Sequence, residues 1–274
     1  MRTVESSWED YSPPITALIT GGGRGIGQSI ALRLAKEGMQ VAISARSADE
    51  LAETVQLSAG QILAIPCDVA DPARVKAMFG EVEDKLGPVS LLVNNAGVGG
   101  PFGAAWENDP QAWWHCLEIN LRGPFLCCRE VMPGMIARRQ GRIINMVSGA
   151  GCYAIKDMSA YVASKTALIR FSENLALEAA PHGVSVFPMR PGLVRTAMVE
   201  EARHQIPAIQ QMLDAGKEVT LDAVADLVVF LASGKADALS GRTFSVNEDY
   251  AEVVAHSGDV LKDELYLLRM RTLS

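Results

Sequence analysis

Tyr161 and Lys165 are four residues apart in the stretch Tyr-Val-Ala-Ser-Lys, a spacing that could support acid–base chemistry. Residues at positions i and i+4 share one face of a helix, so the ammonium group is predicted to lie beside the phenol. A phenol titrates near about 10, and a neighbouring positive charge lowers that pKa. The pair therefore predicts a tyrosine that acts as a general acid or base. Taken alone, the same pair could be two surface residues of a helix.

Further polar residues could complete a site with this pair. Ser148 precedes Tyr161 by 13 residues and directly follows an apolar run at 142–147, and the Asn-Asn-Ala-Gly segment at 94–97 follows another such run. Open α/β sheets bind ligands at the C-terminal ends of their strands, so these segments are predicted to meet there. Asn120 interrupts a helical stretch in which an amide is locally unfavourable. The alternatives are a turn serine, an Asn-rich turn and a satisfied core amide.

A glycine-rich segment, Thr-Gly-Gly-Gly-Arg-Gly-Ile-Gly at 20–27, follows the first apolar run and opens a helical pattern. Glycine lets the backbone approach a ligand closely, and a helix N-terminus presents unpaired N–H groups to phosphate. The segment therefore predicts a dinucleotide-binding loop. A plain tight turn is the alternative.

The end of the second strand indicates which dinucleotide is bound. NAD-binding sheets usually carry an acidic residue there, but this strand is followed by Arg46, and Asp49 and Glu50 are explained by a helix cap. Arg24 lies inside the glycine loop, and two guanidinium groups that converge would suit a 2′-phosphate. NADP(H) is therefore favoured and NAD(H) is possible. Two solvated arginines are the alternative.

The chain alternates between two kinds of segment. Apolar, β-branched runs occur at 15–20, 40–45, 62–66, 89–93, 142–147, 184–188 and 243–246. Helical spacing is seen in Ile26, Ile30 and Leu34, and again in Ala163, Ala167, Phe171 and Leu175. This alternation predicts an α/β fold of the Rossmann type: a doubly wound parallel sheet of about seven strands with helices on both faces.

The boundaries of the elements and of the domain are also readable. Asp71-Pro72 and Asp109-Pro110 each place an acidic cap before a proline at the first helical position, and the stretch at 47–50 resembles a capping box. No linker divides the chain, so a single domain is predicted over 15–249. A flexible arm at 1–14 precedes it and a tail at 250–274 follows it.

Together these residues resemble the single-domain branch of the short-chain dehydrogenase/reductase family over nearly the whole chain. The matching residues and segments are 20–27, Cys67-Asp68-Val69, 94–97, Asn120, Ser148, Tyr161 with Lys165, and Pro191-Gly192 with Thr196. Each match is modest, but their order and spacing are specific.

The resemblance implies roles for individual residues. Tyr161 would exchange the proton with the substrate oxygen, Lys165 would hold the nicotinamide ribose, Ser148 would bond the substrate oxygen, and Asn120 would hold a water in a proton relay. The implied cofactor-binding residues are Gly21, Gly23, Arg24, Gly25, Ile26, Gly27, Arg46, Asp68, Val69, Asn94, Ala96, Gly97, Tyr161, Lys165, Pro191, Gly192, Val194 and Thr196. The implied substrate residues are Cys152, Tyr153, Met158 and Met198, which indicate a fairly apolar substrate.

The sequence departs from the family pattern near its end. The last strand continues as Val-Asn-Glu-Asp at 246–249 where relatives often have Val-Asp-Gly-Gly, and a longer tail follows. Arg190 before Pro191 is also less usual. It could bind an anionic substrate group, or it could pair with an acidic residue of the tail.

Composition limits the classes of partner. The net charge of −7 disfavours nucleic acid, and no apolar run approaches the roughly 20 residues of a membrane span. The five cysteines indicate free buried thiols in a reducing compartment, so a cytoplasmic location is predicted. The four histidines (His115, His182, His204 and His256) are scattered, and no metal is expected. The family resemblance implies a homo-oligomer, a tetramer or a dimer.

The sequence thus predicts an NADP(H)-dependent oxidoreductase that transfers a hydride between nicotinamide and a carbonyl or alcohol carbon. An NAD-dependent alcohol dehydrogenase of the same family is one alternative. A non-catalytic NAD(P)-binding sensor is a second, and a nucleotide-sugar epimerase or dehydratase, which usually has a longer substrate domain, is a third.

Overall fold

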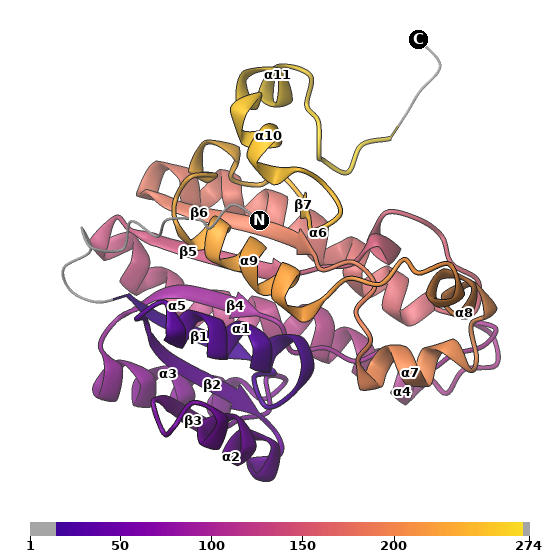
Figure 1. Cartoon of the computed structure of the whole chain (residues 1–274), viewed down its shortest axis with the longest axis horizontal. Coiled ribbons are helices and arrows are strands. Elements are labelled where there is room, and N and C mark those ends of the chain that lie inside the picture. Colours follow the sequence, from indigo (N-terminus) through magenta and orange to yellow (C-terminus); the bar gives the residue numbers. More distant parts are fainter. Residues whose placement is uncertain (1–14, 271–274) are drawn as a thin grey trace.

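One parallel sheet of seven strands organises the computed structural model, which describes residues 15–270 (Figure 1). The strand order is β3-β2-β1-β4-β5-β6-β7, and every neighbouring pair is parallel. The strands are β1 (Thr16–Thr20), β2 (Gln40–Ala45), β3 (Ile62–Pro66), β4 (Val89–Asn94), β5 (Gly141–Met146), β6 (Val184–Arg190) and β7 (Phe244–Ser245). The order reverses between β1 and β4, where doubly wound sheets bind their ligands.

Helices cover both faces of this sheet and extend beyond its C-terminal edge. They are α1 (Gly25–Lys36), α2 (Ala48–Leu57), α3 (Pro72–Leu86), α4 (Pro110–Leu117), α5 (Gly123–Arg138), α6 (Ser159–Ala179), α7 (Ala197–Arg203), α8 (Pro207–Asp214), α9 (Leu221–Ala232), α10 (Tyr250–Ala255) and α11 (Ser257–Lys262). In Figure 1, α4, α7 and α8 gather on the right, and α10 and α11 stand at the top. Within residues 15–270, no helix is long and apolar enough to cross a membrane.

The predicted caps begin the predicted helices. The Asp71 carboxylate accepts the N–H groups of Ala73 and Arg74, and the Asp109 carboxylate accepts that of Ala112. Both helices carry a proline in their first turn, where its missing N–H costs nothing.

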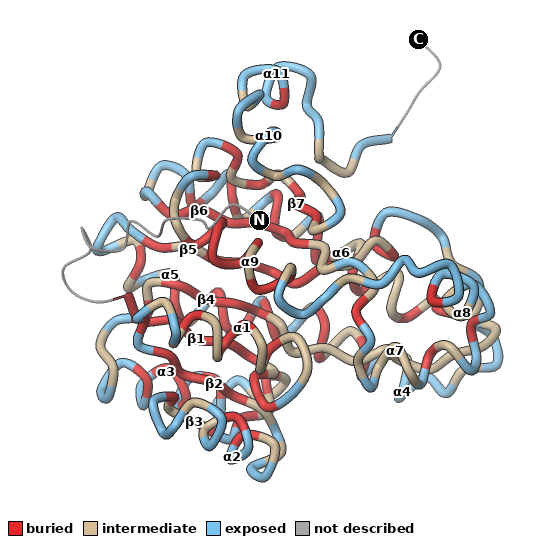
Figure 2. Tube along the Cα trace, viewed as in Figure 1, coloured by how far each residue is buried: buried red, intermediate tan, exposed pale blue. Residues whose placement is uncertain are grey.

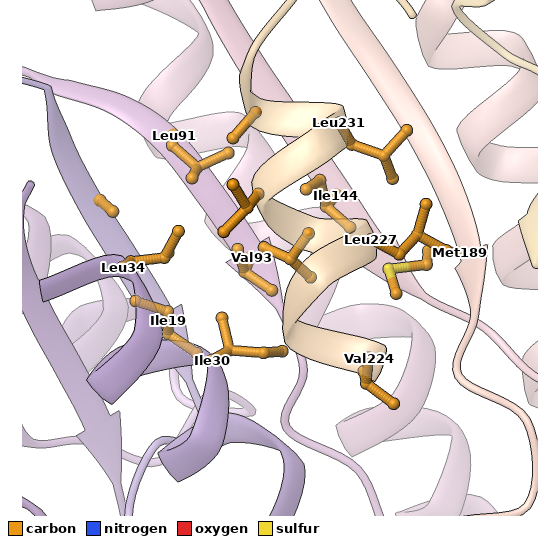
Figure 3. Packing of buried hydrophobic residues seen from close by; sticks show 14 of the residues in the cluster. Ile19, Ile30, Leu34, Leu91, Val93, Ile144, Met189, Val224, Leu227 and Leu231 are labelled. Carbon is orange, nitrogen blue, oxygen red and sulfur yellow. The ribbon is translucent and has the colours of Figure 1, made fainter. Parts of the chain in front are cut away.

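Two apolar layers enclose the sheet. In the layer on the α1 and α9 face, Ile30 and Leu34 meet Ile19 of β1, and Leu227 packs with Ile144 of β5 (Figure 3). The opposite layer belongs to α3, α5 and α6. Burying one such side chain stabilises the fold by about 1.5–3 kcal/mol. Figure 2 shows the strands buried and the outer helix surfaces exposed, so the strand ends are held by a rigid frame.

The structure adds one detail to the predicted helices and corrects the predicted tail. The helical spacing of Ala163, Ala167, Phe171 and Leu175 lies on a half-buried face of α6, whereas the buried face carries Ala160, Lys165, Leu168, Ser172 and Ala176 among others. Polar residues on that buried face disguise it in the sequence. The segment after residue 249 forms α10 and α11 before it becomes irregular. The predicted arm at 1–14 and residues 271–274 lie outside the described residues.

Candidate active site

Ser148, Tyr161 and Lys165 meet at the C-terminal edge of the sheet. Ser148 follows β5, and its side chain forms a hydrogen bond with that of Tyr161 in the first turn of α6. One turn later Lys165 lies beneath the tyrosine, with its Nζ 5.8 Å from the centre of the phenol ring. The Nζ atom donates a 2.8 Å hydrogen bond to the main-chain oxygen of Met146. The predicted helix face therefore exists, and the ammonium group has a fixed position.

Burial governs the ionisation of this pair. It raises the pKa of the Tyr161 hydroxyl above its usual value, and the hydrogen bond from Ser148 opposes this rise without reversing it. Burial also lowers the pKa of Lys165 to about 8, because the interior disfavours the charged ammonium. Burial thus sets the net direction of the tyrosine pKa, and the expectation that Lys165 lowers it stays a prediction. The tyrosine is protonated at neutral pH, as a proton donor must be.

Asn120 connects the active-site segments through its buried amide. It lies in a single π-helical turn (Glu118–Arg122) between α4 and α5. Its Oδ1 accepts the N–H of Val98, and its Nδ2 donates to Val98 O at 2.9 Å and to Ser164 Oγ at 3.0 Å. Ser164 Oγ in turn donates to the main-chain oxygen of Tyr161 at 2.8 Å. The side chain is thus a satisfied core amide, and its role in holding a relay water stays a prediction.

The glycine loop folds tightly against two other segments. A Cβ atom at Gly27 would lie 2.2 Å from the carbonyl oxygen of Gly21, so any side chain there would disrupt the loop. Gly25 has a φ of +57°, and a Cβ added to it would come within 3.5 Å of Thr196 Cγ2. The loop after β6 therefore lies beside the loop after β1. Ile26, between these glycines, packs against the core on the α1 face.

Asn95, which the sequence did not single out, holds the glycine loop to the end of β4. Its Nδ2 donates to the carbonyl oxygens of Thr20 at 2.9 Å and Gly21 at 3.1 Å. Asn94 instead faces the core, where its Nδ2 donates to Asn145 Oδ1 at 2.8 Å. Ala96 and Gly97 continue this loop.

Gly97 places the end of β4 against the catalytic residues. A Cβ atom at this position would lie 3.2 Å from Asn120 Oδ1 and 3.6 Å from Lys165 Nζ. The segment at 94–97 therefore approaches both the glycine loop and the lysine, as the prediction of a shared strand edge requires.

The remaining predicted cofactor residues also follow strand ends. Asp68 and Val69 come after β3: the Asp68 carboxylate accepts the N–H of Ala70, and the buried Val69 side chain lies beside Gly123. Pro191 and Gly192 follow β6, the Val194 side chain is in the core, and Thr196 caps α7.

The two arginines predicted to bind phosphate have different surroundings. Arg24 is exposed and its Nη1 lies 3.3 Å from Glu50 Oε1, so its charge is partly neutralised. Arg46 is exposed, and its side chain has no ion-pair partner among the described residues. Gly23 borders the same glutamate, since a Cβ there would lie 2.9 Å from Glu50 Cβ. Arg46 is therefore the more available of the two cations.

The predicted substrate residues are unequally placed. Cys152 and Tyr153 are exposed, whereas Met158 is buried before α6. Met198 Cγ and the ring of Phe102 both lie near Gly99, at 3.5 and 3.2 Å from the position of a Cβ atom there. Two apolar side chains from α7 and from the segment after β4 thus meet beside the active-site loop.

Arg190 pairs with an acidic residue from the end of the chain. Its Nη2 lies 2.7 Å from Glu248 Oε1, just before the predicted tail. The ion-pair interpretation of this arginine is therefore the one that the structure favours.

Some residues near the site gave no usable signal in the sequence. Ser164 lies within the Tyr-x-x-x-Lys stretch, where only the ends attracted attention. Cys116 was one of five unremarkable cysteines, but its thiol is buried and accepts a hydrogen bond from Asn120 Nδ2 at 3.3 Å. Phe102 follows a Gly-Gly-Pro turn that has no periodicity. Asn95 could have been found, since it lies in the same strand-end segment as Asn94.

The family model for short chain dehydrogenases matches residues 15–207, most of the chain that builds this site. The chain belongs to the short-chain dehydrogenase family. This short-chain dehydrogenase is 35% identical over 240 residues to the 3-oxoacyl-[acyl-carrier-protein] reductase FabG of Staphylococcus aureus, which covers 85% of this chain and 96% of the relative. It is 32% identical over 255 residues to the short chain dehydrogenase pigC of Monascus ruber, covering 90% of this chain and 83% of that one.

Solved structures of relatives share the fold of this short-chain dehydrogenase. A variant of actinorhodin polyketide ketoreductase with NADPH superposes with a TM-score of 0.79 at 32% identity, covering 85% of this chain and 95% of that one. NAD⁺-bound xylitol dehydrogenase also has a TM-score of 0.79, at 27% identity, covering 84% and 96%. The predictions of the family, of the single-domain doubly wound fold and of an oxidoreductase are confirmed.

Proposed function

We propose that this short-chain dehydrogenase is an NADP(H)-dependent reductase that converts the carbonyl group of a small, fairly apolar substrate into an alcohol. One observation carries the proposal. A tyrosine whose pKa burial holds above its usual value lies against Ser148 and above the ammonium of Lys165. Such a phenol is protonated at neutral pH and can donate its proton to a developing alkoxide.

The residues at the strand ends fit a dinucleotide. The glycine loop has no room for side chains at Gly27, and its N–H groups open α1, where a helix N-terminus favours phosphate. Thr196 would border the diphosphate across from Gly25, and Lys165 and Gly97 would border the nicotinamide ribose. When bound, the nicotinamide supplies the hydride to the carbonyl carbon.

Ser148 and Tyr161 then bind and protonate the carbonyl oxygen. The Ser148 hydroxyl donates a hydrogen bond to it and orients the substrate. Tyr161 Oη donates its proton to the same oxygen, which completes the alcohol and leaves a phenolate. The positive charge of Lys165 stabilises that phenolate, and the Met146 carbonyl keeps the ammonium in place.

The preference for NADP(H) is supported by the unpaired charge of Arg46 and by the NADPH of a structural relative. NAD(H) is the second candidate, because another relative is bound to NAD⁺. An NAD-dependent alcohol dehydrogenase would need a tyrosine that loses its proton readily, and the raised pKa of Tyr161 disfavours that direction at neutral pH.

The proposed substrate class follows from the side chains near the site. Phe102 and Met198 are apolar and lie beside Gly99, and relatives are named as a reductase of 3-oxoacyl groups and a polyketide ketoreductase. A ketone or aldehyde with an apolar chain fits these neighbours. A substrate panel in which small polyols react and apolar ketones do not would contradict this part of the proposal.

A homo-oligomer also belongs to the proposed function. Trp114 on α4 and Phe125 on α5 are large apolar side chains that expose 57% and 47% of their surface. Phe125 lies edge-on to Phe171 of α6, with 6.2 Å between the ring centres. A second copy of the chain would cover such a surface.

The substitution Tyr161→Phe tests the proposed chemistry. Removal of the proton donor should lower turnover of carbonyl substrates with NADPH by about 10²–10⁴-fold while cofactor binding persists. NADPH oxidation followed by absorbance gives turnover, and the fluorescence of bound NADPH gives its affinity. A variant with wild-type rates would show that another group donates the proton. A wild-type protein that binds NADPH and reduces no carbonyl would instead favour the non-catalytic sensor.

A further inference from the structure

The last described residues of the chain are hydrogen-bonded to α6, the helix that carries Tyr161 and Lys165. The anchor is Glu173 on α6, which is only 6% exposed. Its Oε1 accepts the main-chain N–H of Leu268 at 2.7 Å, and its Oε2 accepts Nη1 of Arg269 at 3.2 Å. Arg170 donates both to Glu173 and to the Leu268 carbonyl oxygen. The Glu173 carboxylate therefore holds the N–H group of Leu268, and the Arg170 guanidinium holds its carbonyl group.

Two residues of the tail have backbone conformations that are unfavourable in isolation. Glu264 and Tyr266 have φ angles of +50° and +60°, in the left-handed region that costs a non-glycine residue free energy. The Tyr266 carbonyl accepts the N–H of Thr243 at 2.9 Å, next to β7. Such a backbone persists only where its surroundings determine it. The segment at 264–270 is thus a docked part of the fold.

The docked segment brings Leu268 to the support of the Ser148 turn. Leu268 packs against a small apolar cluster of Val147, Leu168 and Ile169. Val147 is joined to Ser148 by the peptide bond, and Ile169 Cδ1 lies 2.8 Å from where a Cβ atom of Gly151 would be. The turn that follows Ser148 therefore rests on the same residues that Leu268 covers.

We propose that the segment at 264–270 is a strap that holds the Ser148 turn against α6, with Leu268 and Glu173 as positioning residues for Ser148. This inference rests on the proposed function, in which Ser148 orients the carbonyl oxygen. The geometry of two groups on separate elements, β5 and α6, must be kept to a fraction of an ångström, and a misplacement of about 1 Å can cost roughly 100-fold in rate.

The test compares Leu268→Ala with Leu265→Ala in the full chain. Leu265 is the matched control because it is in the same segment and is 45% exposed. Amide hydrogen exchange reports on the turn directly, since the N–H groups of Gly151 and Cys152 bond to the carbonyls of Ser148 and Gly149. Leu268→Ala should speed exchange at these amides, and Leu265→Ala should leave it unchanged.

Steady-state kinetics give the second readout. Leu268→Ala and Glu173→Gln should each lower kcat by roughly 3- to 30-fold while the Kd of NADPH stays within about 2-fold of wild type, because Leu268 packs against the residues that support the serine turn. Leu268→Met should restore most of kcat, since it refills the same volume. A general loss of stability would instead lower kcat and raise the apparent Kd of NADPH together.

Two outcomes overturn the proposal. The first is exchange in the Ser148 turn of Leu268→Ala that matches wild type. The second is faster exchange with an unchanged kcat, which would make the strap a structural element without a positioning role. Failure of the proposed function has a different signature: the wild-type enzyme would reduce no carbonyl substrate. In that case hydrogen exchange alone decides whether the strap holds the turn.

Discussion

The burial of Lys165 opposes the positive charge that its proposed role requires. The ammonium must be charged to stabilise the Tyr161 phenolate, yet burial lowers the pKa of Lys165 to about 8. Tyr161 itself stays protonated, because burial raises its pKa above the usual value. The lysine is therefore the group of the pair that changes charge first as the pH rises.

This order predicts the pH dependence of reduction. A lysine with a lowered pKa is charged below that pKa and neutral above it, so stabilisation of the phenolate is complete below about pH 8 and is lost above it. The kcat for carbonyl reduction should be level between pH 6 and about 7.5 and fall as pH passes through about 8. Stopped-flow measurement of single-turnover rates over this range checks the prediction.

Cofactor affinity serves as the control for the pH profile. The Kd of NADPH should be measured at each pH, so that a loss of binding is separated from a loss of chemistry. A rate that stays level to about pH 10 would mean that Lys165 remains charged throughout, as an unperturbed lysine would.

Arg46 and Glu50 should decide between the two dinucleotides. An exposed guanidinium without an ion-pair partner in the described chain is free to bind a 2′-phosphate, and such a charge-assisted contact contributes about 1.5–3 kcal/mol, or roughly 10- to 150-fold in affinity. Arg46→Ala should remove most of the preference for NADPH over NADH. Glu50→Gln should raise NADPH affinity, because it removes a negative charge beside Arg24.

Fluorescence titration with both nucleotides measures these preferences. Lys36→Ala is the matched control, since it removes one positive charge at the far end of α1. Its ratio of NADPH to NADH affinity should equal that of wild type. If NADH binds wild type as tightly as NADPH does, Arg46 is a solvated loop residue and the NAD-dependent alternative is favoured.

At the residue scale, the sequence identified the catalytic pair but not its electrostatics. Tyr161 and Lys165 could be found because their spacing alone places them on one helix face. The direction of the tyrosine pKa depends on burial, which comes from segments distant in the chain and leaves no local pattern. The sequence prediction named Asn94 and not Asn95, and only the alternation of side chains along β4 decides that Asn95 faces the glycine loop.

At the scale of elements, strands were easier to predict than the faces of helices. The predicted run at 40–45 coincides with β2, and the run at 62–66 with β3, because a strand buried on both sides is continuously apolar. The helix α6 could be predicted but its buried face could not, since that face contains Ser164, Lys165, Ser172 and Glu173. Ser164 bonds Asn120, Ser172 bonds Asn145 and Glu173 bonds Leu268, and an apolar periodicity cannot reveal such polar contacts.

The tail shows why contacts between distant elements resist prediction. Its residues look like an irregular apolar–basic mixture, and α10 and α11 are only six residues long each. Leu268 and Arg269, which follow these helices, are held by Glu173, which is 95 residues before Leu268 in the chain. Neither residue has a local pattern that points to the other.

At the scale of the molecule, the site joins both halves of the sheet. The loops after β1 and β4 meet at the point where the strand order reverses, and the loop after β6 reaches across to Gly25. The family model ends at residue 207, before α9, β7 and the tail. The relatives match 85% of this chain, which is more than the family model covers, so the frame of the candidate site is shared with them.

The proposed association of whole molecules gives the last prediction. Trp114 and Phe125 are exposed on α4 and α5, and an apolar surface of this kind loses contact with water when two copies meet. Light scattering of the purified protein at about 10–50 µM should give at least twice the mass of one chain, and the melting temperature should rise with protein concentration. Phe125→Glu should shift the mass toward one chain, because a buried unpaired charge opposes association.

Leu57→Glu, at a 59% exposed position on α2, is the matched control and should keep the wild-type mass. A wild-type protein with the mass of one chain at the same concentrations would leave Trp114 and Phe125 as surface residues and would place the complete active site within a single molecule.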